Sequence, residues 1–229
     1  MVAPEADASP VVNIMGERVA LGPLREEGRV TADDQVQIAQ FVAAAVGSAC
    51  GAAARRAVFT AVRHLPYATN AAADAATLVC LGRGNCLAKA DLLTRGLWLL
   101  GCDARRVRWR YQLPIQPPEV GLLPSRDDIH TAVEVHIEGH WVLVDATHDP
   151  PLARGGFAIS NWDGEHPTPP AYEPHGPIWR EGVDEAAIAA ALATIAAQYQ
   201  GRAAAPEATA GVTYLSAFNA WLEQLRAGS

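Results

Sequence analysis

The spacing of apolar residues changes at Gly101, and this change limits the folds open to the chain. Before Gly101, apolar side chains recur every three or four positions, the repeat of a helix with one buried face, at Cys86, Ala90, Leu93, Leu97 and Leu100. After it they recur at every second position, as in a strand with one wet face, at Val107, Trp109 and Tyr111. Helices that precede strands, instead of alternating with them, predict the α+β class.

Other helices are expected before and after this segment. Thr31 is a good N-cap for a helix to about Val46, and a second helix is expected over 52–64. Two amphipathic helices are expected near the end of the chain, with apolar faces made by Ile188, Leu192, Ile195 and Tyr199 and by Tyr214, Phe218, Trp221, Leu222 and Leu225. Prolines predict irregular loops over 112–128 and 150–177. We expect an irregular arm over 1–30 and a single domain over 31–229.

Two alternating runs around Glu138-Gly139 predict an antiparallel hairpin. If these two residues form the turn, Ile137 faces His140, and paired positions sum to 277. His130 and Asp145 then lie on one face as diagonal neighbours, roughly 7–8 Å apart at Cα. An imidazole and a carboxylate at that separation can meet.

The composition disfavours several classes of protein. With 18 basic and 25 acidic side chains the net charge is −7, whereas a nucleic-acid binder normally carries a basic surplus. We see no secretory leader and no run of about 18 apolar residues, so we expect a cytoplasmic protein that binds no membrane. The cysteines at 50, 80, 86 and 102 form no CxxC pair and are interpreted as separate thiols, with all but Cys86 expected to be inert packing.

Cys86 occupies a position that suits a nucleophile. Asn85 is a favourable N-cap, which places the thiol in the first turn of the helix that ends near Gly101. There the positive end of the helix dipole and unpaired N–H groups stabilise a thiolate, and the same N–H groups can receive the charge of an oxyanion. With His130 as base and Asp145 as the acid that orients it, the three form a predicted catalytic triad.

Each of these residues also has a plainer interpretation. Buried cysteines are usually inert, His130 follows a polar loop like a surface histidine, and Asp145 can be an ordinary strand-end acid. His136 and His140 are expected at the surface, and His148 with Asp149 resembles a turn. A metal site would draw on Cys86, His130, Asp145 and His148, but no standard zinc spacing appears. We expect no metal and no cofactor.

Four ordered blocks of the sequence resemble the transglutaminase-like superfamily, relatives of papain-like cysteine enzymes. The blocks are AVFTAVRHLPY at 57–67, GRGNCLAKADLL at 82–93, LGCDARRVR at 100–108 and HTAVEVHIEGHWVLVDATHD at 130–149. By this resemblance Cys86, His130 and Asp145 fall on the catalytic positions. The resemblance implies helices with the catalytic cysteine at a helix N-terminus, packed on an antiparallel sheet that carries His and Asp. Gly101-Cys102-Asp103 stands where members usually have Gly-Ile-Pro, and the first 50 and last 45 residues match no motif.

The resemblance implies a thioester on Cys86 but leaves its acceptor open. Similar small proteins of actinomycetes include Dieckmann cyclases, which release a carrier-bound polyketide–peptide chain as a tetramate or pyridone. That reaction is the leading expectation, with an acyl or peptidyl carrier protein and its phosphopantetheine-bound substrate as partner. Arg105, Arg106, Arg108 and Arg110 would meet the acidic carrier, although a solvated strand face explains them as well. The alternatives are a cysteine peptidase or amidase, an amide-forming acyltransferase, and a binding module without catalysis.

Overall fold

The computed structural model describes residues 11–14, 17–20, 31–114, 116–117, 120, 127–203 and 208–228. Within 11–20, 198–203 and 208–214 it describes the backbone alone. Its main sheet is antiparallel with the order β6-β5-β4-β7. The strands are β4 (Ala104–Gln112), β5 (Asp127–Ile137), β6 (His140–Val144) and β7 (Trp179–Arg180). The α+β class predicted from the sequence is therefore confirmed.

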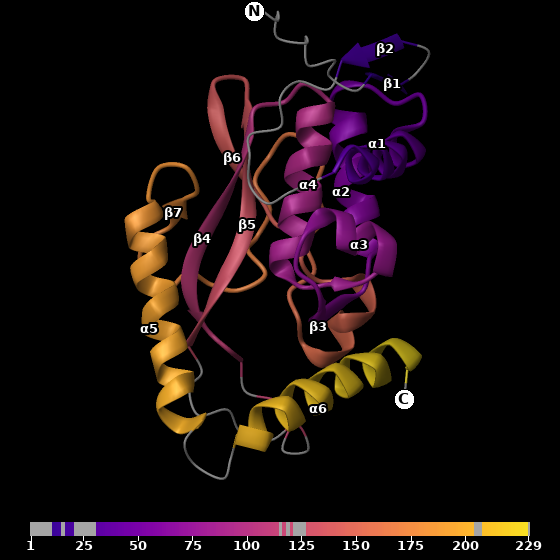
Figure 1. Cartoon of the computed structure of the whole chain (residues 1–229). Helices are drawn as coiled ribbons and strands as arrows, with labels where there is room; N and C mark the ends of the chain where they lie inside the picture. Colours follow the sequence, from indigo (N-terminus) through magenta and orange to yellow (C-terminus); the bar gives the residue numbers. More distant parts are fainter. Residues whose placement is uncertain are drawn as a thin grey trace, which may run out of the picture.

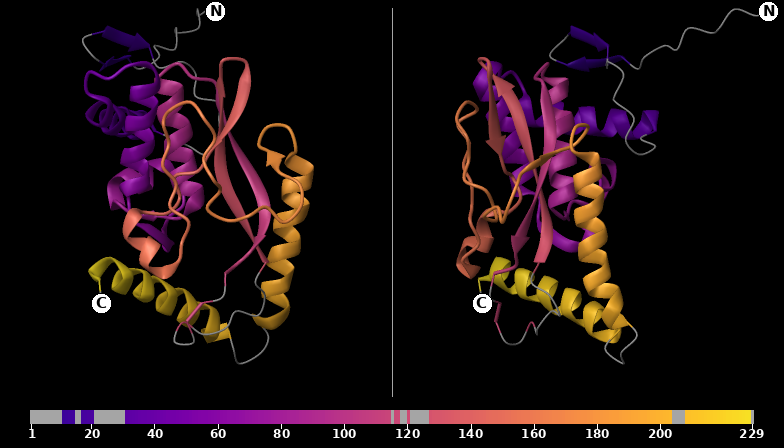
Figure 2. Two further views of the ribbon diagram at one scale, coloured as in Figure 1. Left: turned by 180° about the vertical axis from the view of Figure 1, so that it is seen from behind. Right: turned by 90° about the vertical axis from the view of Figure 1, so that its left-hand side faces the viewer.

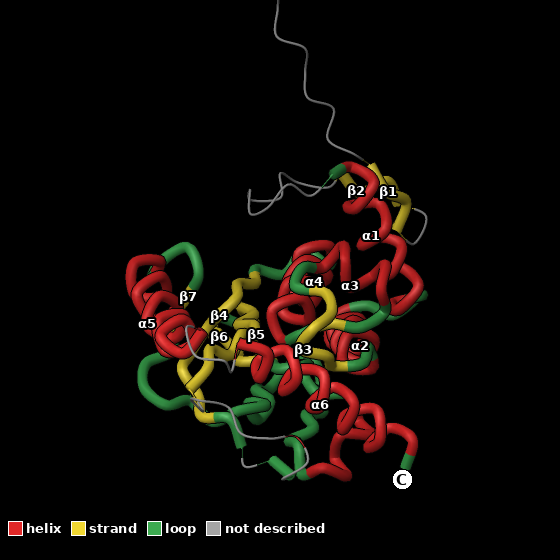
Figure 3. Tube along the Cα trace, turned by 60° about the horizontal axis from the view of Figure 1, so that its bottom comes forward, coloured by secondary structure: helices red, strands yellow, loops and turns green. Residues whose placement is uncertain are grey.

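A group of helices lies beside this sheet, with α4 nearest to the strands (Figure 1). The group comprises α1 (Ala32–Val46), α2 (Gly51–His64), α3 (Ala75–Leu81) and α4 (Cys86–Leu99). On the other side of the strands runs α5 (Glu185–Ala203), which contacts β5 and β7 (Figure 2). The last helix, α6 (Ala208–Ala227), passes beside β3 (Tyr67–Ala72) and the 3₁₀ helix η2 (Pro150–Gly155), as Figure 3 shows.

Local sequence determines where the predicted helices begin. The Thr31 side chain accepts a hydrogen bond from the backbone N–H of Asp34, and the Asp34 carboxylate accepts one from the backbone N–H of Thr31, so α1 starts with a capping box. Asn85 accepts from the N–H of Ala88 at 3.0 Å, which starts α4 at Cys86 as expected. Gly101, with φ of 75°, follows the end of that helix.

The central helix α4 is buried on all sides between residues 88 and 97. Asp91 and Arg95 inside it are paired, because an isolated buried charge is costly. Asp91 binds Arg95 at 2.9 Å and Arg106 of β4 at 2.7 Å. Gly96 lets α2 approach closely, since a Cβ there would lie 2.6 Å from Cγ1 of Val58 and 3.3 Å from Cγ2 of Val42.

Several details differ from the sequence predictions. Strand β3 and helix α3, capped by Asp74, occupy a stretch for which no element was predicted. Ala191 lies on the buried face of α5 and Leu192 is 41% exposed, so the predicted face was wrong at that position. Cys50 and Cys80 are exposed, so packing was the wrong interpretation for both, whereas Cys102 is partly buried.

The structure describes the predicted N-terminal arm and the first proline-rich loop only in part. Residues 11–14 and 17–20 form a two-stranded antiparallel sheet, β1 (Val11–Ile14) and β2 (Glu17–Ala20), and the rest of the predicted arm lies outside the described residues. So do 115, 118–119 and 121–126 of the first proline-rich loop. The second, 150–177, is irregular apart from η2, as predicted. Within the described residues, no single helix has the length and apolarity needed to span a membrane, although α1 and α2, bent by 117° at their junction, would meet that test together.

Replacing Gly96 tests the close approach of α4 to α2. We expect Gly96→Ala to lower the free energy of unfolding by about 1 kcal/mol or more, because overpacking costs about 1–3 kcal/mol and outweighs the helix-propensity gain of about 1 kcal/mol. Val58→Ala removes the obstructing methyl groups. Urea denaturation of both single variants and the double variant should show a double variant less destabilised than the sum of the singles. Simple additivity would contradict the proposed clash.

Candidate active site

Cys86 is held at the start of α4 by the backbone that precedes it. The N–H of Gly84 donates to Pro66 O at 3.1 Å, and the N–H of Asn85 donates to Ala72 O at 3.0 Å. A side chain at Gly84 would not fit, because its Cβ would lie 2.9 Å from Ala72 O. These contacts fix the first turn of α4 against β3, with the thiol partly buried.

The hairpin brings His130 and Asp145 together as its register predicted. Val133 pairs with Val144 and Ile137 with His140, so the paired positions sum to 277 as expected. His130 Nε2 donates to Asp145 Oδ2 at 2.8 Å, and both side chains are fully buried. The predicted meeting of imidazole and carboxylate is present in the structure.

The Asp145 carboxylate is surrounded by donors. Its Oδ2 also accepts from the N–H of Ala171 at 2.7 Å, and its Oδ1 accepts from the N–H of Thr147 at 3.1 Å. Burial alone would raise the pKa of Asp145, but the charge and hydrogen bond of His130, the N–H of Ala171 and the side chain of Thr147 lower it below the ordinary value. The carboxylate therefore stays ionised next to the imidazole.

The electrostatics of His130 follow from the same pair. Burial lowers the pKa of His130, but the charge and hydrogen bond of Asp145 outweigh that effect, and the nearby Cys86 raises the pKa further, so the pKa of His130 lies above its ordinary value. Since Nε2 is committed to Asp145, Nδ1 is the ring nitrogen left for the thiol. Nδ1 is buried and has no hydrogen-bond partner of standard geometry among the described side chains. The structure thus brings the three predicted residues into one site, with Nδ1 available for a proton.

Aromatic rings surround the imidazole. Trp109, Tyr111 and Tyr172 lie edge-on to His130 at centroid distances of 4.8, 5.9 and 5.1 Å. Tyr172 also stacks on Tyr111 at 4.2 Å. These rings keep water from the His130–Asp145 bond, and a lower local polarity strengthens it.

His148, Tyr172 and Tyr67 form a chain of hydrogen bonds in which the donor and the acceptor at His148 can be assigned. His148 Nδ1 must donate to the carbonyl of Ala158 at 3.0 Å, because a carbonyl oxygen only accepts. Burial lowers the pKa of His148 to about 4, so its Nε2 carries no proton and accepts from the Tyr172 hydroxyl at 3.1 Å. Tyr172 is in turn hydrogen-bonded to Tyr67, and burial raises the pKa of both tyrosines. Both hydroxyls thus remain protonated beside Cys86.

Lys89 joins the elements that carry the nucleophile and the acid. It lies three residues after Cys86, is 1% exposed, and its ammonium donates to Arg63 O, Leu65 O and Thr147 O at 3.1, 2.7 and 2.6 Å. Burial lowers its pKa to about 7, although the carboxylates of Asp149 and Asp145 oppose this. Its three bonds tie α4 to the end of α2 and to the loop just beyond Asp145.

Helix α6 is attached to the site by an arginine. Arg226 binds both oxygens of Asp149, at 2.8 and 2.9 Å, and donates to Tyr67 O at 2.8 Å. Asp149 Oδ1 also accepts from the N–H of Tyr67 at 2.8 Å. Helix α6 is therefore bonded to Asp149 and Tyr67, and Tyr67 belongs to the apolar cluster against which Cys86 packs.

The other sequence candidates have different surroundings. His136 and His140 are exposed, as predicted. His148 and Asp149 follow β6, but both are buried and hydrogen-bonded, which the interpretation as a turn did not anticipate. Among the described residues no group of three or more His, Cys, Asp or Glu side chains is arranged to hold a metal ion.

The arginines of β4 are bound to carboxylates and do not form a solvated face. Arg105 pairs with Glu134 at 2.6 Å and Arg110 with Asp127 at 3.1 Å. Arg106 and Arg108 share Glu181. Each of the four charges is thus matched within the fold.

Comparison with known proteins gives partial matches to solved structures. No family model matches the chain, and no curated protein matches it. A crystal structure described as that of a TGase is similar over 56% of this chain and 35% of that chain, with 14% identity and a TM-score of 0.38. The "putative cysteine protease" of Cytophaga hutchinsonii is similar over 56% of this chain and 42% of that chain, with 20% identity and a TM-score of 0.38. The chain thus spans less than half of either protein, and the site rests on its own geometry.

Removing the carboxylate of Asp145 tests the buried pair through stability. The lowered pKa of Asp145 means that its contribution is present above about pH 4 and is lost as pH falls through the folded value. The raised pKa of His130 means that its contribution is present below about pH 6.5 and is lost as pH rises through the folded value. Asp145→Asn should therefore cost most, about 3–5 kcal/mol, between about pH 4 and 6.5.

Urea denaturation across pH measures this cost. Asp163→Asn is the matched control, because Asp163 also binds a histidine, His166, at 2.7 Å but is 55% exposed. The control should change stability far less at every pH. A cost for Asp145→Asn that is constant from pH 3 to 9 would contradict the ionic description of the pair.

Proposed function

We propose that this protein is a cysteine acyl-transfer enzyme in which Cys86 is the nucleophile, His130 the general base and acid, and Asp145 the group that orients His130. The observation that carries the proposal is the buried His130, whose Nε2 is bonded to Asp145 at 2.8 Å while Nδ1 is left for Cys86. The resemblance of the four sequence blocks to the transglutaminase-like superfamily supports the same assignment.

The first half of the reaction forms a thioester. His130 Nδ1 takes the thiol proton, and the resulting imidazolium is stabilised by Asp145. The thiolate of Cys86 attacks the acyl carbon of the donor, and the Sγ–C bond forms as the carbonyl becomes an oxyanion. Expulsion of the leaving group, which takes the proton from His130, restores the carbonyl and leaves the acyl group on Cys86.

The second half repeats these steps with an acceptor. His130 removes a proton from the acceptor, which attacks the thioester, and Cys86 leaves as a thiolate that regains its proton. Main-chain N–H groups at the start of α4 are the proposed oxyanion donors, since the first turn of a helix leaves them without partners inside the helix. Asn85 occupies the N–H of Ala88, so the donors would come from earlier positions.

The acceptor separates the specific forms of this proposal. Dieckmann cyclisation, in which a carbanion of the bound chain is the acceptor, remains our leading form, with a carrier protein as donor. Hydrolysis and amide formation are the alternatives. The β4 arginines give the carrier no particular support, because each is already paired with a carboxylate.

Acylation of the cysteine can be tested directly. Incubation with acyl thioesters of N-acetylcysteamine should add one acyl mass to the wild-type protein in intact mass spectra, and Cys86→Ala should gain none. Cys80→Ala is the matched control, because Cys80 is an exposed thiol on α3 and is not a member of the proposed triad, and this variant should be acylated normally. An adduct that persists in Cys86→Ala would contradict the assignment of the nucleophile, and its absence from every form would favour a binding module.

The carrier-dependent form has its own test. A β-ketoamide thioester on a carrier protein should give a transient adduct on Cys86 that decays to a cyclic tetramate or pyridone. Asp145→Asn should slow this release by about 10⁴-fold, as expected where the base loses its orienting acid. Release of the linear acid alone would overturn cyclisation and leave hydrolysis as the reaction.

A further inference from the structure

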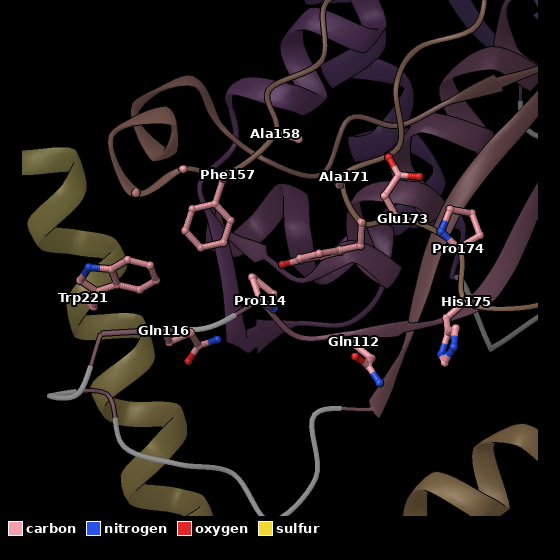
Figure 4. Close-up of a pocket in the computed structure, with 13 residues that line it drawn as sticks. Gln112, Pro114, Gln116, Phe157, Ala158, Ala171, Glu173, Pro174, His175 and Trp221 are labelled. Atoms are coloured by element: carbon pink, nitrogen blue, oxygen red, sulfur yellow. The ribbon is translucent and has the colours of Figure 1, made fainter.

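A pocket of about 460 Å³ is lined in part by Ala171 and Tyr172, which also contact the His130–Asp145 pair. Figure 4 shows the side chains that surround the pocket. Its walls come from parts of the chain that are far apart in sequence: the end of β4, the segment after η2, residues 171–175, and α6. Pockets that bind small molecules commonly have volumes of about 300–1,000 Å³. The space is therefore larger than an acetyl group requires.

The pocket is apolar at its base and polar at its opening. Phe157 and Tyr172 are buried at 9% and 7% exposure, and they form the base together with Ala171. Gln112 and Glu173, which also line the pocket, are exposed. A ligand with an apolar body and an outer end in water fits this distribution.

The base of the pocket is shared with the catalytic site. Tyr172 lines the pocket and lies 5.1 Å from His130, while its neighbour Ala171 donates its N–H to Asp145. Cys86 packs against the apolar cluster that includes Phe157, and Trp221 packs against the same cluster. The thiol and the pocket therefore border the same apolar cluster.

Helix α6 completes the pocket through a close contact at Gly155. A Cβ at Gly155 would lie 2.5 Å from Cδ1 of Leu225 and 3.1 Å from Cζ2 of Trp221. The glycine thus allows α6 to approach the segment after η2 and to place Trp221 in the pocket wall (Figure 4). Arg226, bonded to Asp149, holds the same helix against the site.

We propose that this pocket binds the apolar body of the acyl group that Cys86 accepts, a medium-length aliphatic or aromatic chain. The proposal rests on the acyl-transfer function above and adds the substrate class to it. The carbonyl of such a chain lies at the thiol, its body packs against Phe157, Tyr172 and Trp221, and its outer end reaches the polar opening. Burial of each further methylene then strengthens binding.

Acyl chain length is the experimental variable. Octanoyl and phenylpropionyl thioesters of N-acetylcysteamine should acylate wild-type protein with kcat/KM at least about tenfold above the acetyl thioester, through a lower KM. Trp221→Ala removes a wall, and Ala158→Leu fills space in the pocket. Both variants should reduce the preference about tenfold, and far-UV circular dichroism and thermal unfolding, compared with wild type, verify that they are folded.

Binding without chemistry separates this proposal from the proposed function. Octanamide should bind Cys86→Ala saturably by calorimetry, and Cys86→Ala/Trp221→Ala should bind it about tenfold more weakly. Octanamide binding without acylation of any wild-type sample would support the pocket and overturn the acyl-transfer function. Acylation at equal rates for acetyl and octanoyl thioesters, or a preference unaffected by both wall variants, would overturn the pocket and leave the function standing.

Discussion

The arrangement of the site depends on one buried ammonium group. Lys89 satisfies three carbonyl oxygens, from the end of α2 and from Thr147, and lies one turn after Cys86 on the same helix. Thr147 in turn donates its N–H to Asp145, so a short series of bonds runs from the helix of Cys86, the proposed nucleophile, to Asp145. A neutral amine offers only two N–H donors for the three oxygens. Burial lowers the pKa of Lys89 to about 7, which disfavours the charged ammonium that is needed to donate to all three carbonyl oxygens.

A similar balance governs the His130–Asp145 pair. Full burial removes both groups from water, which is unfavourable to each charge, and the bond between them offsets part of that cost. The carboxylate completes its shell with main-chain N–H groups from Ala171 and Thr147. Three aromatic rings exclude water from the imidazole. Burying both charges therefore costs free energy, although the Asp145 carboxylate is fully hydrogen-bonded. Such buried ionisable pairs are more typical of functional sites than of groups that only stabilise a fold.

The parts of the site that could be predicted are those encoded by local patterns. Asn85 caps its own helix, and the Glu138-Gly139 turn fixes a register that extends to His130 and Asp145 by counting. Tyr172, Lys89 and Arg226 had no such signal, because their partners lie far away in sequence and no periodicity relates them. Strand β3 was missed because its sequence, YATNAA, shows no clear apolar alternation. Leu192 was misplaced because alanine-rich α5 can bury alanine in place of leucine.

If Cys86 forms the proposed thioester, the triad by itself does not select the acceptor, so selectivity has to come from what surrounds it. His130, Asp145 and the aromatic wall belong to the sheet and to the loop that covers it. Phe157 and Trp221 instead come from the segment after η2 and from α6, and these two parts meet because Gly155 has no side chain. Arg226 anchors α6 to Asp149 and to the backbone of Tyr67, next to the thiol. The C-terminal helix, which matches no motif in the sequence, is thus the element that brings Trp221 to the pocket proposed to hold the acyl group.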